Sequence, residues 1–181
     1  MREDQKVVVE MPEGVSVELN NGLFKFKGQK GEVEKKLANP NIISKVEQNK
    51  VVFEVKKGTK REKKLLGTFK AHVRNAVKGV TEGHVYKLKI CSGHFPMNVS
   101  VSGDEFVVKN FLGEKIPRKV KISNGVSVKV NGQEVIVEGI DKQVVSQQAA
   151  SIEQLCRITN RDRRIFQDGI FIIEKDGKQV R

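Results

Sequence analysis

Short apolar stretches separated by turn-forming residues run through the first third of the chain. They occupy residues 7–10, 15–19, 23–26 and 51–55, with a weaker candidate at 45–47. Residues 15–19 alternate apolar and polar side chains, and Asn or Gly residues follow several of the stretches. Alternation at period two with such punctuation is typical of short antiparallel strands. The pattern therefore predicts a small sheet before residue 59.

The period changes to helical spacing at Thr59. Thr59 and Glu62 form a Thr-x-x-Glu capping box, in which the two side chains satisfy backbone amides at a helix start. Apolar residues then recur three and four positions apart, at Leu66, Phe69, Val73 and Val77, which predicts one apolar helix face. Gly79 and Gly83 are expected to end this helix.

Residues 84 onward repeat the same order of elements. Strand-like segments lie at 85–90, 99–101 and 106–108, and residues 133–138 match residues 49–54. Asp141 can cap a second helix, with an apolar stripe at Val145, Ala149, Ile152 and Cys156. The offset between the two halves is about 82 to 84 residues throughout, which indicates an internal duplication.

This repeat predicts an α+β protein with two tandem, structurally similar domains. We place the N-terminal repeat at residues 1–82 and the C-terminal repeat at residues 83–181, with a hinge near 81–83. Each repeat is expected to be a small, mainly antiparallel sheet packed against one helix. Gly28-x-x-Gly31 resembles the loop with which KH domains clamp nucleic acid, but that loop joins two helices. We interpret the segment as a hairpin turn.

The charge balance favours a polyanionic partner. The chain has 34 Lys and Arg against 22 Asp and Glu, a net charge of +12. It has no run of 18 apolar residues and no apolar signal segment, so we expect a cytoplasmic protein with no membrane association. Cys91 and Cys156 stand alone and far apart, which favours two buried, reduced thiols over a disulfide or a zinc site.

The sequence contains no recognisable catalytic centre. His72, His84 and His94 are scattered without metal-ligand spacing, and we expect each to be an ordinary surface or core histidine. Neither a Gly-x-Ser-x-Gly turn nor a Gly-Lys-Ser/Thr phosphate loop occurs. We therefore predict no enzymatic activity, no metal, no cofactor and no small-molecule substrate.

The C-terminal run of residues 160–175 is the strongest candidate for function. It places Asn160, Arg161, Arg163 and Arg164 just past the expected end of the second helix, followed by a Gln-Asp-Gly turn and a short strand at 170–173. Guanidinium groups present flat forks of donors that suit phosphate oxygens and base edges. The alternative is a solvated helix end, where cations also complement the helix dipole.

Two further features carry weaker signals. Six basic residues surround the start of the first helix with Glu62 as their one counter-charge: Lys56, Lys57, Lys60, Arg61, Lys63 and Lys64. Cations there oppose the helix dipole, so an anionic partner or simple solubility explains them better than helix stability. The loop at 92–96 carries Phe95, which could contact RNA or pack on the hinge; we favour packing.

Several segments together resemble one known family. They are Val-Glu-Met-Pro at 9–12, Thr-Phe-Lys-Ala-His-Val-Arg-Asn at 68–75, Gly-His-Phe-Pro-Met at 93–97, Gly-Ile-Asp-Lys-Gln-Val at 139–144, and the run from 160 to 170. With the repeat, they make the chain similar to the archaeal and eukaryotic-type branch of the large-subunit ribosomal protein six family. The resemblance covers nearly the whole chain.

This resemblance implies a structural role in the large ribosomal subunit. The chain would bind 23S-type ribosomal RNA near the stalk base where translation GTPases dock, in a single copy beside neighbouring ribosomal proteins. The C-terminal repeat would make the main contact, through Arg157, Asn160, Arg161, Arg163, Arg164, Gln167, Asp168, Lys175 and Lys178. Within this set we assign Asp168 to holding the turn at Gly169. The alternatives are a basic two-domain RNA-binding module outside the ribosome and an RNA-modifying enzyme.

Overall fold

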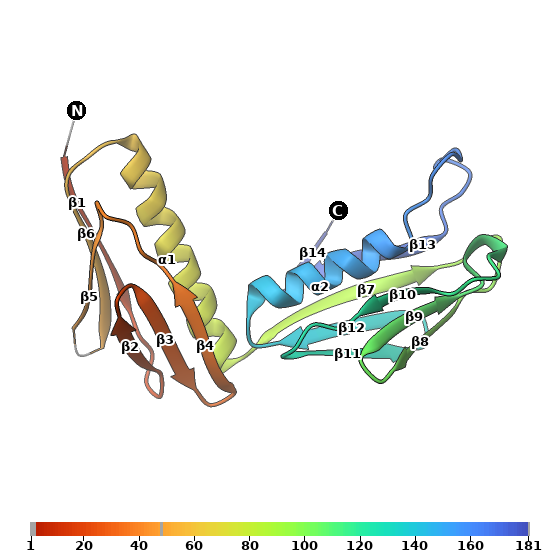
Figure 1. Ribbon diagram of the computed structural model, residues 1–181, viewed down its shortest axis with the longest axis horizontal. Helices are drawn as coiled ribbons and strands as arrows, with labels where there is room; N and C mark the ends of the chain where they lie inside the picture. Colours follow the sequence, from red (N-terminus) through yellow and green to blue (C-terminus); the bar gives the residue numbers. More distant parts are fainter. Residues whose placement is uncertain (1–2, 48, 181) are drawn as a thin grey trace. The chain divides into compact units, whose positions relative to one another are not determined.

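A computed structural model describes residues 3–47 and 49–180. The chain divides into two compact units, Met1–Gly83 and His84–Arg181. Each unit combines antiparallel strands with one long helix (Figure 1), which confirms the predicted fold class of two similar α+β domains. No helix of the described residues is long and apolar enough to span a bilayer.

The first unit contains two three-stranded antiparallel sheets and one helix. Its elements are β1 (Glu3–Glu10), β2 (Ser16–Asn20), β3 (Leu23–Gly28), β4 (Gly31–Lys36), β5 (Ile43–Glu47), β6 (Lys50–Gly58) and α1 (Lys60–Thr81). One sheet has the order β1-β6-β5 and the other β2-β3-β4. Since α1 contacts strands of both sheets, it joins them around one core. The single sheet expected from the sequence is thus two small sheets.

The predicted capping box begins α1. The Thr59 hydroxyl accepts from the Arg61 amide at 3.2 Å, and the Glu62 carboxylate accepts from the Thr59 amide at 2.9 Å. The Thr59 hydroxyl and then the Thr59 amide, both donating to the Glu62 carboxylate, lower the pKa of Glu62 to about 2. The carboxylate is therefore ionised over the whole neutral range and interacts favourably with the positive end of the helix dipole.

Of the two glycines expected to end α1, Gly83 does so and Gly79 does not. Gly79 lies buried inside the helix, which continues to Thr81 and buries Val80. An interior glycine costs only about 1 kcal/mol relative to alanine, so packing of the last turn outweighs it. Gly83 has φ +82°, and its amide donates to the Lys78 carbonyl at 3.1 Å, as at many helix ends. Leu66, Phe69 and Val73 are buried as predicted, whereas Val77 is only partly buried.

Several phenylalanines lie among the aliphatic side chains in the core of the first unit. Phe24, Phe26 and Phe53 are fully buried, and the Phe53 ring also lies 5.5 Å from that of Phe69 between centroids. The hairpin of β3 and β4 turns at Gly28 and Gly31, as predicted from the Gly-x-x-Gly segment. A Cβ at Gly28 would lie 2.7 Å from the carbonyl oxygen of Val80, so only glycine lets this hairpin tip reach the end of α1.

The second unit repeats this arrangement and adds to it. Its elements are β7 (His84–Cys91), β8 (Asn98–Ser102), β9 (Glu105–Lys109), the 3-10 turn η1 (Phe111–Gly113), β10 (Arg118–Lys121), β11 (Val126–Asn131), β12 (Glu134–Gly139), α2 (Lys142–Leu155), β13 (Gly169–Lys175) and β14 (Lys178–Gln179). The order β11-β12-β7 repeats β5-β6-β1, and β8-β9-β10 repeats β2-β3-β4. The addition is β13, which pairs with the outer edge of β7 and carries β14.

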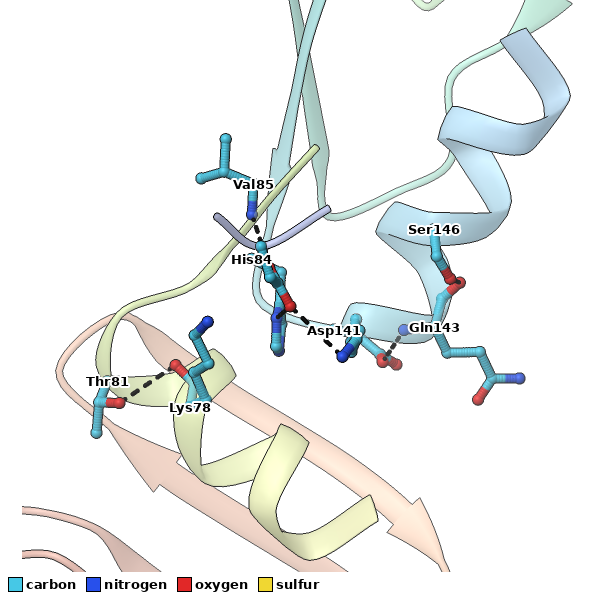
Figure 2. Close-up of polar contacts among 9 residues, drawn as sticks. Lys78, Thr81, His84, Val85, Asp141, Gln143 and Ser146 are labelled. Carbon is cyan, nitrogen blue, oxygen red and sulfur yellow. Dashed lines mark hydrogen bonds and ion pairs between the residues drawn. The ribbon is translucent and has the colours of Figure 1, made fainter. Parts of the chain in front are cut away.

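Helix α2 begins and packs as the sequence predicts. The Asp141 carboxylate accepts from the Gln143 amide at 2.9 Å (Figure 2). Val145, Ala149, Ile152 and Cys156 are all buried in the core. Near the same end of the unit, His84 is buried with its Nδ1 2.8 Å from the Asp176 carboxylate, which also accepts from the Val85 amide. The turn between β13 and β14 is thereby fixed to the start of β7.

Candidate nucleic-acid interface

A loop of residues 156–168, the arginine loop, joins α2 to β13 and projects from the end of the helix (Figure 1). It folds on itself at Asp162, whose carboxylate accepts from the Arg164 amide at 2.9 Å and from the Arg164 guanidinium. The Asp162 carbonyl accepts from the amides of Ile165 and Phe166. Asn160 adopts a left-handed conformation with φ +58°, which short amide side chains tolerate well. The loop is therefore a structured turn.

Asp168 anchors the arginine loop to the loop that follows β7. Its Oδ1 accepts from the amides of Gly93 at 2.6 Å and His94 at 3.0 Å, and its Oδ2 lies 2.5 Å from Nδ1 of His94. The Asp168 side chain is buried. Burial raises the pKa of this carboxyl, but the hydrogen bonds from His94 and Gly93 outweigh burial and hold the pKa below its usual range. Asp168 therefore has a structural role, consistent with its assignment to holding the turn.

A stack of three side chains continues this anchor toward solvent. The His94 ring lies parallel to the Phe166 ring, with centroids 4.6 Å apart, and the Arg161 guanidinium lies 4.8 Å from the Phe166 centroid. A guanidinium over an aromatic face gains cation–π attraction. The stack fixes the direction of Arg161 although its side chain lies on the surface.

Arg118 holds the base of the loop from the opposite side. Its guanidinium donates to the carbonyls of Leu155 at 2.7 Å and Arg157 at 3.3 Å, which lie at the C-terminal end of α2. It also pairs with Glu114 and lies 4.3 Å from the Phe111 ring centroid. A cation donating to the last carbonyls of a helix satisfies acceptors that the helix leaves open. Arg118 therefore fixes where α2 ends and where Arg157 begins.

Six of the predicted RNA-binding residues lie together and exposed on the arginine loop: Arg157, Asn160, Arg161, Arg163, Arg164 and Gln167. Arg164 pairs with Asp162 at 2.7 Å, with its side chain 90% exposed. Within residues 3–47 and 49–180, Arg157 and Arg163 make no ion pair with a carboxylate. The loop thus presents cationic groups that the chain itself leaves partly uncompensated.

The remaining predicted residues of the C-terminal repeat lie elsewhere. Lys175 and Lys178 face each other in the β13–β14 hairpin. They lie at the far end of β13 from Gly169, roughly 20 Å away at about 3.3 Å per strand residue. The structure does not bring these two lysines together with the arginine loop. They form a separate basic point on the same unit.

The secondary basic patch of the first unit is exposed throughout. Lys56, Lys57, Lys60, Arg61, Lys63 and Lys64 all lie on the surface where β6 leads into α1. Lys57 has a left-handed φ of +52°, and its amide donates to the Asp4 carboxylate at 2.7 Å. This hydrogen bond holds the bend that separates the strand from the helix.

Sequence reasoning missed the roles of His94 and Arg118. The expected packing of the loop at 92–96 on the hinge is wrong, because β7 carries this loop to the other end of the unit from His84. Phe95 is 46% exposed and lies beside Gly113 of η1, and His94 contacts Asp168 of the arginine loop. Two sequence features could have indicated these roles: the short Gly-His-Phe-Pro segment, and Glu114 four residues before Arg118. Neither feature identifies a partner that lies 37 to 75 residues away in the sequence.

Both cysteines are free thiols, as the sequence predicts, but the expected burial holds for Cys156 and is wrong for Cys91. Burial raises the pKa of the Cys156 thiol to about 11, while Cys91 is only partly buried. Within the described part of the chain, no group of three or more His, Cys, Asp or Glu side chains could hold a metal ion.

Two α+β repeats, the second carrying an anchored arginine loop, define a duplicated basic protein. The chain belongs to the ribosomal protein L6 family, whose model matches residues 11–83 and 95–169. It is 48% identical over 170 residues to large ribosomal subunit protein uL6 of Methanococcus vannielii, covering 94% of this chain and 93% of the relative. It is 47% identical over 167 residues to uL6 of Methanosarcina mazei, covering 92% and 95%. The predicted family, and its archaeal type, are confirmed.

Proposed function

We propose that this protein is a structural constituent of the large ribosomal subunit that binds large-subunit ribosomal RNA through the arginine loop. The observation that carries the proposal is a set of exposed arginines on a loop fixed by Asp168, His94 and Arg118. Both archaeal relatives are named as large ribosomal subunit proteins, which supports the large subunit as the assembly that contains this protein.

The proposed mechanism is passive binding. Arginines that contact phosphates release condensed counterions, so affinity should fall steeply as salt rises. Because the arginine loop is held at three points, little conformational entropy is lost when it binds. Contacts to phosphates and 2′-hydroxyl groups would fix register on a folded RNA element by its shape more than by its sequence.

The two repeats would have unequal roles. The C-terminal repeat, residues 83–181, carries the main ribosomal RNA surface, with Lys175 and Lys178 as a second contact point. In the N-terminal repeat, residues 1–82, the patch at Lys56–Lys64 supplies further phosphate contacts. We place the protein near the stalk base where translation GTPases dock, in one copy per cytoplasmic ribosome beside other ribosomal proteins, with no catalytic step of its own.

Sedimentation tests the assignment. A native lysate is run through sucrose gradients at low and high salt, and the fractions are probed for this protein. Co-migration with the large subunit at both salt concentrations is the expected result for a built-in component. Release into light fractions by modest salt would contradict a ribosomal constituent and favour a general RNA-binding module. Absence from every RNA-containing fraction would contradict both.

A further inference from the structure

The second unit contains a cleft beside the arginine loop. Contacts between exposed arginines and phosphates would not by themselves require such a cleft. It lies between the last turn of α2, the arginine loop and β13, and its volume is about 1010 Å³. This is at the upper end of the range of roughly 300 to 1,000 Å³ for small-molecule sites. The cleft can therefore receive a group much larger than a phosphate.

One wall of the cleft is an aromatic ring that the fold leaves outside the core. Side chains alternate along β13, so Ile170 is buried at 1% exposure while Phe171 is 37% exposed and lines the cleft. A Cβ at Gly169 would lie 3.0 Å from Cζ of Phe171, so the glycine lets the ring lie against the strand backbone. The ring is thus held in place and presents an apolar surface.

The charged groups of the cleft favour an anion. Arg157, Arg163 and Arg164 line it, and the first two have no carboxylate partner among the residues described. Its two carboxylates are already engaged: Glu153 accepts from the Ile172 amide at 3.0 Å, and Asp168 accepts from Gly93 and His94. Gln154 and Gln167 add amide groups that can both donate and accept. An aromatic surface beside cations and amides fits a nucleotide.

We propose that the cleft receives the base of one unpaired nucleotide of the bound RNA, against Phe171, with its phosphates on Arg157 and Arg163. The proposal rests on the proposed function and adds to it a ligand class for this cleft. Bases of a paired helix remain stacked and out of reach, whereas loops and bulges can extend a base onto an aromatic side chain. Stacking accepts any base, and the glutamine amides supply the means for a preference among them.

The test is chemical probing of the RNA at single-nucleotide resolution. Full-length protein is bound to protein-free large-subunit RNA, and unpaired bases are modified with dimethyl sulfate and a carbodiimide. The expected result is protection of one or two unpaired bases by the wild type. Phe171→Ala should restore the reactivity of those bases and weaken binding about tenfold, with the salt dependence of affinity unchanged.

Matched variants separate stacking from folding and from charge. Phe171→Trp should keep the protection and Phe171→Leu should lose most of it, with equal melting temperatures for both variants and the wild type. If Arg163→Ala does not weaken RNA binding, or if the wild type does not bind the RNA, the proposed function fails. If the wild type binds with the expected salt dependence but protects no unpaired base, or if protection survives in Phe171→Ala, the cleft proposal alone is overturned. If the occupant of the cleft were a protein segment, the wild type would bind the RNA but would protect no unpaired base.

Discussion

Asp168 and His94 lie 74 positions apart in the sequence, yet Oδ2 of one is 2.5 Å from Nδ1 of the other. This contact joins the arginine loop to the loop after β7 and continues through Phe166 to Arg161. The arginines therefore reach solvent from a loop whose base is fixed by a buried carboxylate. Changes at the arginine end of this chain of contacts should therefore affect binding alone, whereas changes at Asp168 should affect both stability and binding.

Replacing Arg161, Arg163 and Arg164 with Ala should strip RNA affinity and leave stability nearly unchanged. All three side chains are exposed, so little packing is lost, and an exposed ion pair such as that of Arg164 with Asp162 adds little to stability. Filter binding across a salt series should show a shallower salt slope together with the loss of affinity. The matched control is Lys175→Ala with Lys178→Ala, which should lose less affinity. Equal losses of melting temperature and binding in the arginine variant would mean that the cluster is structural.

Asp168→Ala should loosen the arginine loop while its arginines remain. The change leaves the amides of Gly93 and His94 without their acceptor, at a cost of about 1 to 3 kcal/mol. We expect the melting temperature to fall by several degrees, faster proteolysis within residues 156–168, and weaker RNA binding. Asp104→Ala is the control, because it removes an exposed carboxylate of the same unit that lies outside the arginine loop, in the turn between β8 and β9. A rigid loop in Asp168→Ala would refute the anchoring role.

The pKa shifts predict acid sensitivity at two identified sites. Glu62 and Asp168 both have a folded-state pKa below the ordinary value, about 2 for Glu62. Each contribution to the free energy of unfolding is complete above the ordinary pKa of the carboxyl and is lost as pH falls through its folded value. The free energy of unfolding should therefore decline from about pH 4.5 toward pH 2. Glu62→Gln should flatten part of this decline in urea titrations, and an unchanged profile would contradict the capping contribution.

The two thiols should differ in reactivity. Cys156 is buried with a pKa of about 11, so its reactive thiolate is scarce in the folded state, whereas Cys91 is partly exposed. A thiol reagent at pH 8 should modify Cys91 first and Cys156 only on unfolding. Because the folded pKa of Cys156 is raised, ionisation of the unfolded chain should lower stability as pH rises from about 9 to 11. Fast modification of Cys156 in folded Cys91→Ser protein would contradict its burial.

The sequence alone predicts the duplication, the two helix starts and most strands, because these depend on local periodicity and on capping groups within a few residues. Thr59 with Glu62, Asp141, and the stripe from Val145 to Cys156 are all found as expected. The arginine cluster is visible as well, since it is contiguous in the chain. The error at Gly79 arises because burial of Val80 outweighs the intrinsic helix preference of glycine.

Only the tertiary structure decides what holds and surrounds the arginines. The addition of β13 to the edge of β7 brings Asp168 beside His94, and Arg118 reaches the end of α2 from a different sheet. The same strand carries Lys175 away from the arginine loop and turns Phe171 into the cleft. Such contacts join residues far apart in sequence, and their geometry follows from strand register and packing, which local patterns do not encode.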